Sequence, residues 1–522
     1  MSAECFDCPS VVEDCYLEGC NAVDGSVRPA VSTNTQIPGP SIQVCHGDTV
    51  RVRLINELVD HSGLTIHWYG MHQIGTNWMD GASMITQCPV PQSSSFVYKF
   101  IANPAGTHWW HAHSGYQRDD GMFGSLIVKQ PKEAEQNSNE YDVDVAENVI
   151  MLLDWSSRPA ISVFLMTQSP SRYIDTSKQT FSMLVNGRAI SKIPYTGDTN
   201  DYYTPLSTFE VDEGLAYRFR LISGVFGWCN MHVSVESHPL TIIALDGYEV
   251  MPTEVDSLVV APGERVDFVL KATAYPSSYC IYFYGTDTSN CTDNGAAMLV
   301  YKNQSFGNKI CTSTESSNIK STFSLFDTHA LEPLDPQMSI SDEKYVISLT
   351  SHHSPIVSND GRISTDGRIP SYQIDNVVFS YPSSPFLTPN LRSFETCSPN
   401  GNMLGYASCS SNECRCTNVL KLKQGQIVDF FVINKDSVSH SMHLHGNSFR
   451  ILALDSVEDI THWTSDKLAN VRQTPPELAV IKDTVNVPAH GYAIIRLLLN
   501  NPGYWITSPT SMQTIYGMSP AF

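Results

Sequence analysis

Apolar and polar residues alternate along many short segments of this chain, and helical spacing is scarce. Ile42 and Val44 are separated by one residue, and Val50, Val52 and Leu54 continue the alternation. A period of two places side chains on one face of an extended strand, so the pattern predicts half-buried β-strands. Comparable segments recur along the whole chain, at 93–102, 124–130, 207–223, 256–272, 419–435 and 486–500.

One phrase, in which a turn containing glycine precedes a long apolar strand, occurs three times. It is HGDTVRVRL in the first part of the chain, DEGLAYRFRL in the middle and KQGQIVDFFV near the end. Repetition at domain length favours three related β-sandwiches, and the predicted fold class is therefore all-β.

Two polar stretches predict the joints between these domains. KEAEQNSNEYDVD, at 132–144, is charged and polar, and 304–342 is rich in Ser and Thr. The predicted divisions are a Cys-rich N-terminal extension (1–25), a first domain (26–131), a second (140–303), a linker (304–342) and a third domain (343–522). Within the last domain, 358–372 and 388–402 are expected to be long surface loops.

The charge balance narrows the class of partner. Lys and Arg number 32 against 53 acidic residues, which gives a formal charge of −21. Such a surface repels phosphate backbones and anionic lipid, so no nucleic acid is expected as a partner. No stretch approaches the roughly 20 apolar residues of a membrane-spanning helix, so no membrane insertion is expected either.

The chain contains 14 cysteines, many of them in two clusters. Zinc is a rival explanation, but neither cluster has two CxxC pairs, and the even total favours disulfides throughout. The sequons at Asn290 and Asn303 agree with an oxidising compartment. The first ten residues lack the apolar core of a signal peptide. We therefore expect a secreted, glycosylated protein written without its leader.

Histidines gather in three segments, LTIHWYGMHQIGTNWMDG, AGTHWWHAHSGYQRDDGMFGSLIV and HSMHLHGNSF. His111 and His113 are two residues apart, as are His443 and His445. On a strand this spacing puts both rings on one face, about 7 Å apart, where they can ligate one metal or a close pair.

These segments resemble the copper-binding segments of laccase-like multicopper oxidases, in particular the invertebrate and arthropod-type branch. The resemblance runs from Val27 to Met518 and includes IPGPSIQVCHGDTV, HQIGTNWMDGASMITQCPV, GTHWWHAHSG, APGERVDFVL, MHLHGNSF and NPGYW. It implies three consecutive cupredoxin-like Greek-key β-sandwich domains. It also implies a blue copper in the third domain and a three-copper cluster between the first and third domains.

The resemblance also shows what this chain has lost. After NPGYW the family places His-Cys-His, which bridges the blue copper to the cluster. Ser508, Pro509 and Thr510 occupy those positions, and Thr514 replaces the second blue-copper histidine. Pro509 offers no donor atom. No other alignment restores the ligands, because neither His nor Cys follows His490.

Several ligand positions are unchanged. Of the blue-copper set only His440 survives, and one cluster histidine is replaced by Tyr69. The resemblance assigns His67 and His443 to the lone copper of the cluster. It assigns His113 and His445 to one copper of the coupled pair, and His111 to the other copper of that pair.

Three functions follow as hypotheses. The first is a non-oxidase binding or structural protein with an unknown small-molecule or protein partner, in which the histidines are relics. The second is a protein or enzyme with one copper or zinc ion at His67, His443, His113 and His445, with Tyr69 as a further phenolate ligand. The third is a non-redox enzyme in the former substrate pocket. None of them includes the full four-copper complement.

Other residues in these segments are expected to have plainer roles. Asp80 and Asp120 directly precede glycines, and Asp119 precedes Asp120, which favours turns. His440 is interpreted as a polar wall residue, and surface or capping roles are expected for His46, His72 and His108.

Overall fold

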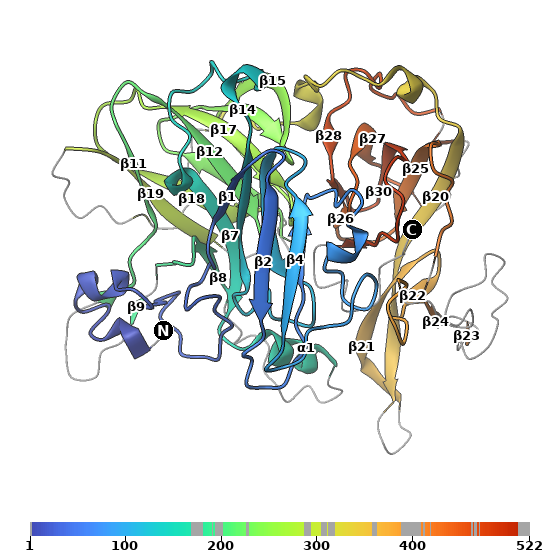
Figure 1. Ribbon diagram of the computed structural model, residues 1–522, viewed down its shortest axis with the longest axis horizontal. Helices are drawn as coiled ribbons and strands as arrows, with labels where there is room; N and C mark the ends of the chain where they lie inside the picture. Colours follow the sequence, from blue (N-terminus) through green and yellow to red (C-terminus); the bar gives the residue numbers. More distant parts are fainter. Residues whose placement is uncertain are drawn as a thin grey trace.

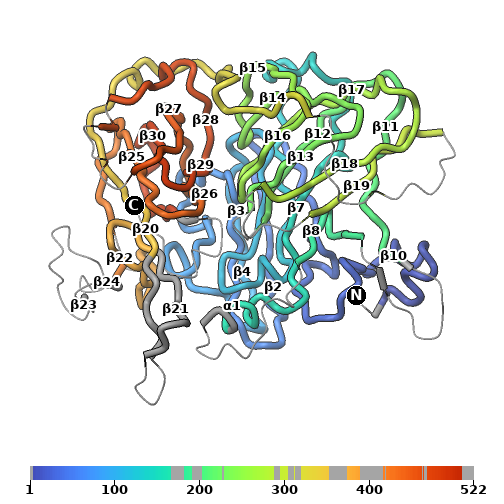
Figure 2. Tube along the Cα trace, turned by 180° about the vertical axis from the view of Figure 1, so that it is seen from behind, coloured from blue at the N-terminus to red at the C-terminus, as the bar shows by residue number. Residues whose placement is uncertain are grey.

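The computed structural model describes most of the chain: residues 3–168, 181–190, 192–193, 202–225, 229–286, 294–303, 311, 319–357, 363–387, 409–410, 413–417, 419–460, 463, 467–468 and 470–509. Strands dominate these residues, and the predicted all-β class of three cupredoxin-like domains is confirmed. Figure 1 shows the strands of the first domain between those of the second and the third, and Figure 2 shows the same order from behind.

The first domain is a sandwich of two small sheets. One sheet has the order β1-β6-β5-β3 and the other pairs β2 with β4. Every residue of β3 and β5 is buried, because these strands carry Trp68, Trp109 and Trp110 into the core and into the boundary with the other domains. The strands are β1 (Ile42–Cys45), β2 (Thr49–Ile55), β3 (Ile66–Tyr69), β4 (Ser95–Ile101), β5 (Gly106–Ala112) and β6 (Phe123–Lys129).

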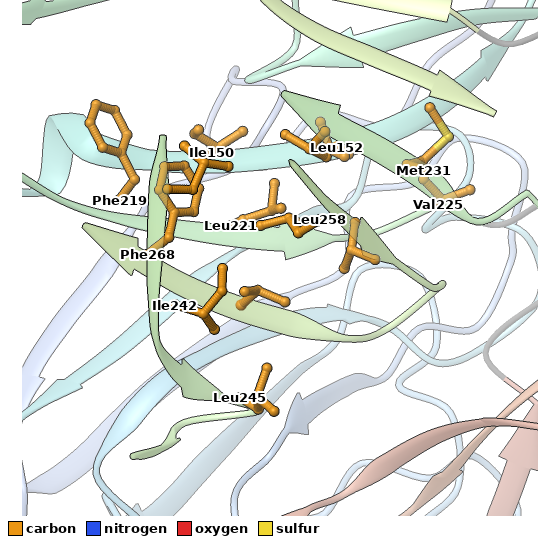
Figure 3. Packing of buried hydrophobic residues seen from close by; sticks show 14 of the residues in the cluster. Ile150, Leu152, Phe219, Leu221, Val225, Met231, Ile242, Leu245, Leu258 and Phe268 are labelled. Carbon is orange, nitrogen blue, oxygen red and sulfur yellow. The ribbon is translucent and has the colours of Figure 1, made fainter. Parts of the chain in front are cut away.

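The second domain packs a six-stranded sheet, β15-β14-β17-β12-β7-β8, on a five-stranded one, β11-β19-β18-β13-β16. Figure 3 shows its core, where Phe219 and Phe268 stack with ring centroids 5.5 Å apart. Burying each such side chain stabilises the fold by roughly 1.5–3 kcal/mol. The strands are β7 (Val149–Ser156), β8 (Phe181–Val185), β11 (Thr208–Val211), β12 (Ala216–Ser223), β13 (Met231–Val235), β14 (Leu240–Leu245), β15 (Tyr248–Val255), β16 (Ser257–Val260), β17 (Arg265–Lys271), β18 (Ser278–Gly285) and β19 (Asn294–Tyr301), with β9 (Lys192–Ile193) paired to β10 (Tyr202–Tyr203) beside them.

The third domain combines a nine-stranded sheet, β23-β24-β22-β21-β20-β25-β30-β27-β28, with a three-stranded one, β29-β26-β31. Its strands are β20 (Glu343–Val357), β21 (Ile363–Ile374), β22 (Val377–Phe379), β23 (Cys409–Ser410), β24 (Glu413–Cys416), β25 (Ile427–Asn434), β26 (His440–Leu444), β27 (Phe449–Ser456), β28 (Ile481–Lys482), β29 (Thr484–Val487), β30 (Gly491–Leu498) and β31 (Thr507–Pro509).

One predicted loop in this domain is wrong. Most of the segment 358–372 belongs to β21, which pairs with β20 from Leu349 opposite Ile374 to Val357 opposite Ile363. The glycines and polar residues that suggested a loop are accommodated because backbone pairing with β20 does not require alternating apolar side chains. The other predicted loop, 388–402, lies outside the described residues.

Helices are short. The described elements include the α-helix α1 (Ala160–Gln168) and 3-10 turns at η1 (Ala3–Cys5), η2 (Val12–Tyr16), η3 (Asn77–Met79), η4 (Lys132–Ala134), η5 (Ala146–Asn148), η7 (Leu325–Asp327) and η8 (Pro336–Ser339). In the part of the chain that the structure describes, no helix is long and apolar enough to cross a lipid bilayer.

Disulfides hold the N-terminal extension and the second domain. Cys5 is bonded to Cys20, Cys8 to Cys15 and Cys280 to Cys311. Cys229 and Cys416 are also disulfide-bonded. The expectation that all cysteines are paired is wrong, because Cys45 and Cys88 have free, exposed thiols.

The two glycosylation predictions have different outcomes. Asn303 is exposed in the turn after β19, where a glycan has room, and its modification stays a prediction. Asn290 lies outside the described residues.

Candidate metal centre

The histidine-bearing strands of the first domain place two rings side by side. His67 on β3 is paired directly with His111 on the neighbouring strand β5. On the other side of the domain boundary, β26 carries His443, which pairs with Ser508 of β31. Two β-strands from different domains thus aim imidazoles at one buried point.

His67 and His443 meet across that boundary with their Nε2 atoms 3.4 Å apart. The Nδ1 atom of His67 donates to the carbonyl oxygen of Asp80 at 2.9 Å, and that of His443 donates to the carbonyl oxygen of Asp483 at 3.0 Å. A carbonyl oxygen only accepts hydrogen bonds, so each Nδ1 bears the proton. In the neutral rings both Nε2 atoms therefore present lone pairs to each other.

Two facing lone pairs repel unless a cation lies between them. A proton on His443 is disfavoured, because burial lowers the pKa of this ring below its ordinary value. A metal ion accepts lone pairs from both rings at once, and copper and zinc are the ions that imidazole suits. The donor set therefore fits the metals that the sequence predicted.

His445 completes a group of three. Its Nδ1 donates to the Oδ2 atom of Asp80 at 2.9 Å, and its ring stacks on that of His67 with centroids 3.8 Å apart. One nitrogen from each of His67, His443 and His445 lies within 4.8 Å of the others. Asp80 thus orients two of the three rings, in the way that outer carboxylates and carbonyls orient metal-ligating histidines.

Asp80 was expected only to form a turn, and it does end η3. It is also fully buried, and although burial alone raises the pKa of a carboxyl, His445 and His67 hold the pKa of Asp80 well below its ordinary value. Asp80 therefore both forms the turn and accepts hydrogen bonds from His67 and His445. The Asp-Gly sequence is the same for either role, so it could not distinguish them.

The remaining cluster histidines adjoin the group. The ring centroids of His111 and His113 lie 5.6 and 5.5 Å from that of His67, and His113 lies 5.1 Å from His445. The Nδ1 of His111 donates to the carbonyl oxygen of Ala112 at 2.8 Å, which leaves its Nε2 as an acceptor. Burial lowers the pKa of His113 to about 3. The structure thus brings together all five histidines that the sequence singled out.

Tyr69 packs on the centre and stays protonated. Its ring stacks on His443 with centroids 3.6 Å apart, and its hydroxyl bonds the Oγ1 atom of Thr484 at 2.8 Å. Burial raises the pKa of this phenol well above its ordinary value. The hydroxyl is engaged by Thr484, so the hypothesis of a phenolate ligand is not supported by this geometry.

A charged pair that sequence reasoning missed lies behind His443. Arg265 of β17 bonds both carboxylate oxygens of Asp483, and its guanidinium lies 5.1 Å from the centroid of the Tyr69 ring. Asp483 in turn holds His443 through its backbone carbonyl. The APGERVDFVL segment was recognised as a family landmark, but a single arginine in a strand gives no signal for burial.

His440, which the family resemblance assigns to the blue-copper set, lies in a hydrogen-bonded polar cluster. His440 is fully buried and its Nε2 lies 2.6 Å from the Oδ2 atom of Asp436, whose other oxygen accepts from the backbone and hydroxyl of Ser351 at 2.6 and 2.8 Å. Ser441 donates to the carbonyl oxygen of Pro262 at 2.6 Å. Thr510 and Thr514 lie outside the described residues, as does the side chain of Pro509.

The other three histidines lie away from the group. His46 is exposed and bonds Asn103 at 3.0 Å, in line with a surface role. His72 is partly buried and its Nε2 lies 3.1 Å from the hydroxyl of Tyr248. The surface or capping role expected for His108 is only half correct, because its ring is fully buried while its Nε2 bonds the carbonyl oxygen of Pro104 at 3.1 Å.

Comparison with protein families gives the same ancestry for all three domains. Models described as "Multicopper oxidase" match residues 18–133, 146–304 and 389–509. Among characterised proteins, the chain is 26% identical over 502 residues to Laccase-1 of Cryptococcus neoformans, covering 92% of this chain and 74% of that protein. It is 27% identical over 491 residues to an iron transport multicopper oxidase of Candida albicans, covering 92% and 70%.

Solved structures show the same fold. The crystal structure of Fet3p, a multicopper oxidase that functions in iron import, superposes with a TM-score of 0.74 at 22% identity, covering 96% of this chain and 87% of that one. The laccase from Botrytis aclada superposes with a TM-score of 0.73 at 23% identity, covering 96% and 84%. Because family models match all three domains and the fold is shared, the chain belongs to the multicopper oxidase family.

Proposed function

We propose that this protein is a non-oxidase multicopper oxidase homologue that holds a single copper or zinc ion between its first and third domains. His67, His443 and His445 are the ligands. The observation that carries the proposal is the 3.4 Å approach of two Nε2 lone pairs, each fixed by a carbonyl oxygen on the far side of its ring.

The oxidase reaction of the family needs a cysteine-ligated blue copper, because the thiolate collects electrons and passes them to the cluster. Ser508, Pro509, Thr510 and Thr514 stand at the positions of the missing ligands. No thiolate or imidazole is present there to bind the metal or conduct the electron. The loss of the blue centre supports a non-oxidase function.

The protein's own groups determine what an ion held here can do. Three neutral imidazoles leave the charge of the ion largely uncompensated, and a bound ion would supply Lewis acidity at that point. The carboxylate of Asp80 and the carbonyl of Asp483 keep the rings aligned. His113 is only partly buried, and its ring lies 5.1 Å from that of His445.

The proposal is tested by metal analysis of the purified protein. We expect about one copper or zinc ion per chain, no blue colour with copper, and no oxygen uptake with diphenol substrates. His443→Ala should abolish the stoichiometric ion, and the matched control His46→Ala, at an exposed histidine outside the group, should keep it. Metal-free protein that takes up no ion on addition of copper or zinc refutes the metal site. A blue cupric centre or oxygen turnover refutes the non-oxidase function.

We also propose that the protein works in an oxidising, extracellular compartment. Three disulfides among the described residues support this, because such bonds persist where thiols are not kept reduced. Asn303, which is exposed, is a glycosylation site under this proposal. A shift in mass on treatment of the secreted protein with an amidase for N-linked glycans, smaller in Asn303→Gln than in the parent protein, tests it.

A further inference from the structure

A hollow lies at the junction of all three domains, and its lining includes Gly446 and Asn447, which follow His445 in the chain. It has a volume of about 490 Å³ and is lined by the first domain, by β15, by the linker near residues 332–338 and by the start of β27. None of the five cluster histidines lines it. Small-molecule sites of about 300–1,000 Å³ occur preferentially at domain interfaces, so both the size and the place of this hollow suit a ligand.

One residue from each domain contributes to a hydrogen-bonded part of the wall. The hydroxyl of Tyr248 lies 3.1 Å from the Nε2 of His72 and donates to the Oγ atom of Ser448 at 2.8 Å. Ser448 is also 3.3 Å from the same Nε2. These hydrogen bonds join all three domains at the hollow, so the shape of the hollow depends on how the domains pack together.

The charges of the lining are unequal. Glu249, Glu332 and Asp335 contribute carboxylates, and Arg450 is the single Lys or Arg among the lining residues. The guanidinium of Arg450 is buried and donates to four backbone carbonyls, those of Pro476, Ala479, Glu332 and Pro333. These carbonyls occupy the donors of Arg450. Because three carboxylates stand against this one cation, the formal charge of the lining is negative.

The three carboxylates differ in what they already bind. Glu249 accepts from the backbone N–H groups of Gln136 and Asn137, and Asp335 accepts from that of Gln337. Among the described residues the carboxylate of Glu332 accepts no hydrogen bond, and its side chain is exposed. Glu332 therefore has all of its acceptor capacity available to a ligand.

Apolar groups complete the lining. Ile74 is 63% exposed, and Pro104, Met338 and Phe449 also face the hollow. Ile74 and a carboxylate that accepts no hydrogen bond among the described residues line the same hollow, which suits a molecule with a hydrocarbon body and a cationic end. A preformed metal site is a poor alternative, since the group of three convergent ligands found among the described residues is the one at His67.

We propose that this hollow binds a small organic ammonium ion, whose charged nitrogen donates to Glu332 and whose apolar body lies against Ile74. The site is independent of the metal centre. A hydrogen bond to a charged partner contributes about 1.5–3 kcal/mol, so removing the charge from either side weakens binding about tenfold or more.

The test uses three probes of one shape and different charge, which are benzylamine, benzyl alcohol and benzoate. Calorimetric titration of the full chain should show benzylamine binding at least about tenfold more tightly than benzyl alcohol, and no binding of benzoate. Glu332→Gln should remove the preference for the amine and leave the affinity for benzyl alcohol unchanged. The matched control Glu57→Gln changes an exposed carboxylate outside the lining and should alter neither.

The position of the probe separates this site from the metal centre, because amines also ligate metals. Crystals soaked in 4-bromobenzylamine should show anomalous bromine scattering beside Ile74, both in metal-loaded and in chelator-treated protein. Benzyl alcohol binding as tightly as benzylamine identifies a neutral polar site and overturns the proposal. So does an unchanged amine affinity in Glu332→Gln, or bromine found only at the histidine group.

Discussion

The guanidinium of Arg265, in the second domain, donates to both carboxylate oxygens of Asp483, in the third domain, at 2.6 and 2.5 Å. Both residues are buried, and Asp483 holds His443 through its backbone carbonyl. The second domain contributes no histidine to the metal centre. It nevertheless supports one of the ligands through this pair.

We expect Arg265→Met to destabilise the protein by about 3–5 kcal/mol, because it leaves a buried carboxylate with too little compensation. The affinity for metal should fall by about 10–100-fold, as for other residues that support a ligand. Denaturant unfolding and metal titration measure the two effects.

Lys302→Met is the control: it breaks an exposed ion pair with Asp212 and should leave both the stability and the metal affinity nearly unchanged. Equal losses in the two variants would contradict a special role for the buried pair.

Gly81 is predicted to be irreplaceable because of a close backbone contact. It has a φ of +81°, and a Cβ atom there would lie 1.7 Å from the carbonyl oxygen of Ile66, the residue before His67. Gly81→Ala should therefore shift His67 and weaken metal binding as well as stability.

Gly425→Ala is a matched control for this prediction. Gly425 has a similar φ of +85° but has nothing within 4 Å of its Cβ position. It should lose about 1–2 kcal/mol from backbone strain and keep its metal. If Gly81→Ala loses no more stability than Gly425→Ala in chemical denaturation, the contact with Ile66 does not have the importance assigned to it.

The stability of the protein should fall with rising pH through Asp119. Burial raises the pKa of this carboxyl to about 8, although Arg118 lies 3.2 Å away and opposes the shift. The unfolded carboxyl titrates near pH 4, so the folded state holds the proton more tightly between about pH 4 and pH 8. The contribution is fully present below the lower value and is lost as pH approaches the higher one.

Asp119→Asn should remove this dependence. The variant should gain stability relative to the parent protein between pH 5 and pH 8, by on the order of a few kcal/mol, in urea unfolding at both values. Glu147→Gln, at an exposed position, should show no such change. A constant difference between Asp119→Asn and the parent protein at the two pH values would mean that Asp119 is already ionised in the folded state.

Alkylation should distinguish the cysteines without unfolding the protein. Cys45 and Cys88 are free and exposed, so iodoacetamide should modify both in native, unreduced protein. The residues of the two N-terminal disulfides should react only after reduction and unfolding. Peptide mass spectrometry reads out each site, and protection of Cys88 or Cys45 would show that the thiol is paired after all.

Much of the architecture follows from local sequence, because strand periodicity is a property of neighbouring residues. Alternation at Val50, Val52 and Leu54 predicts β2 directly. The segment at 363–374 escaped prediction because its pairing with β20 is a backbone property that glycine and polar residues permit.

The ligands of the metal centre were also predictable from local sequence, but the residues that support them were not. Motifs located all five cluster histidines, since each belongs to a segment with a characteristic spacing. Asp483 and Arg265 were missed because their importance arises from contacts across domain boundaries, which no local pattern records. Tyr69 was placed correctly, but its protonation depends on burial and on the partner Thr484.

His67 and His443 are 376 residues apart in the chain. An ion held by both rings therefore links two distant parts of the polypeptide, and it is released when the chain unfolds. Binding to the folded form alone adds stability that grows with the logarithm of the free ion concentration. The lifetime of the protein in the presence of proteases would then rise and fall with the metal supply of its surroundings.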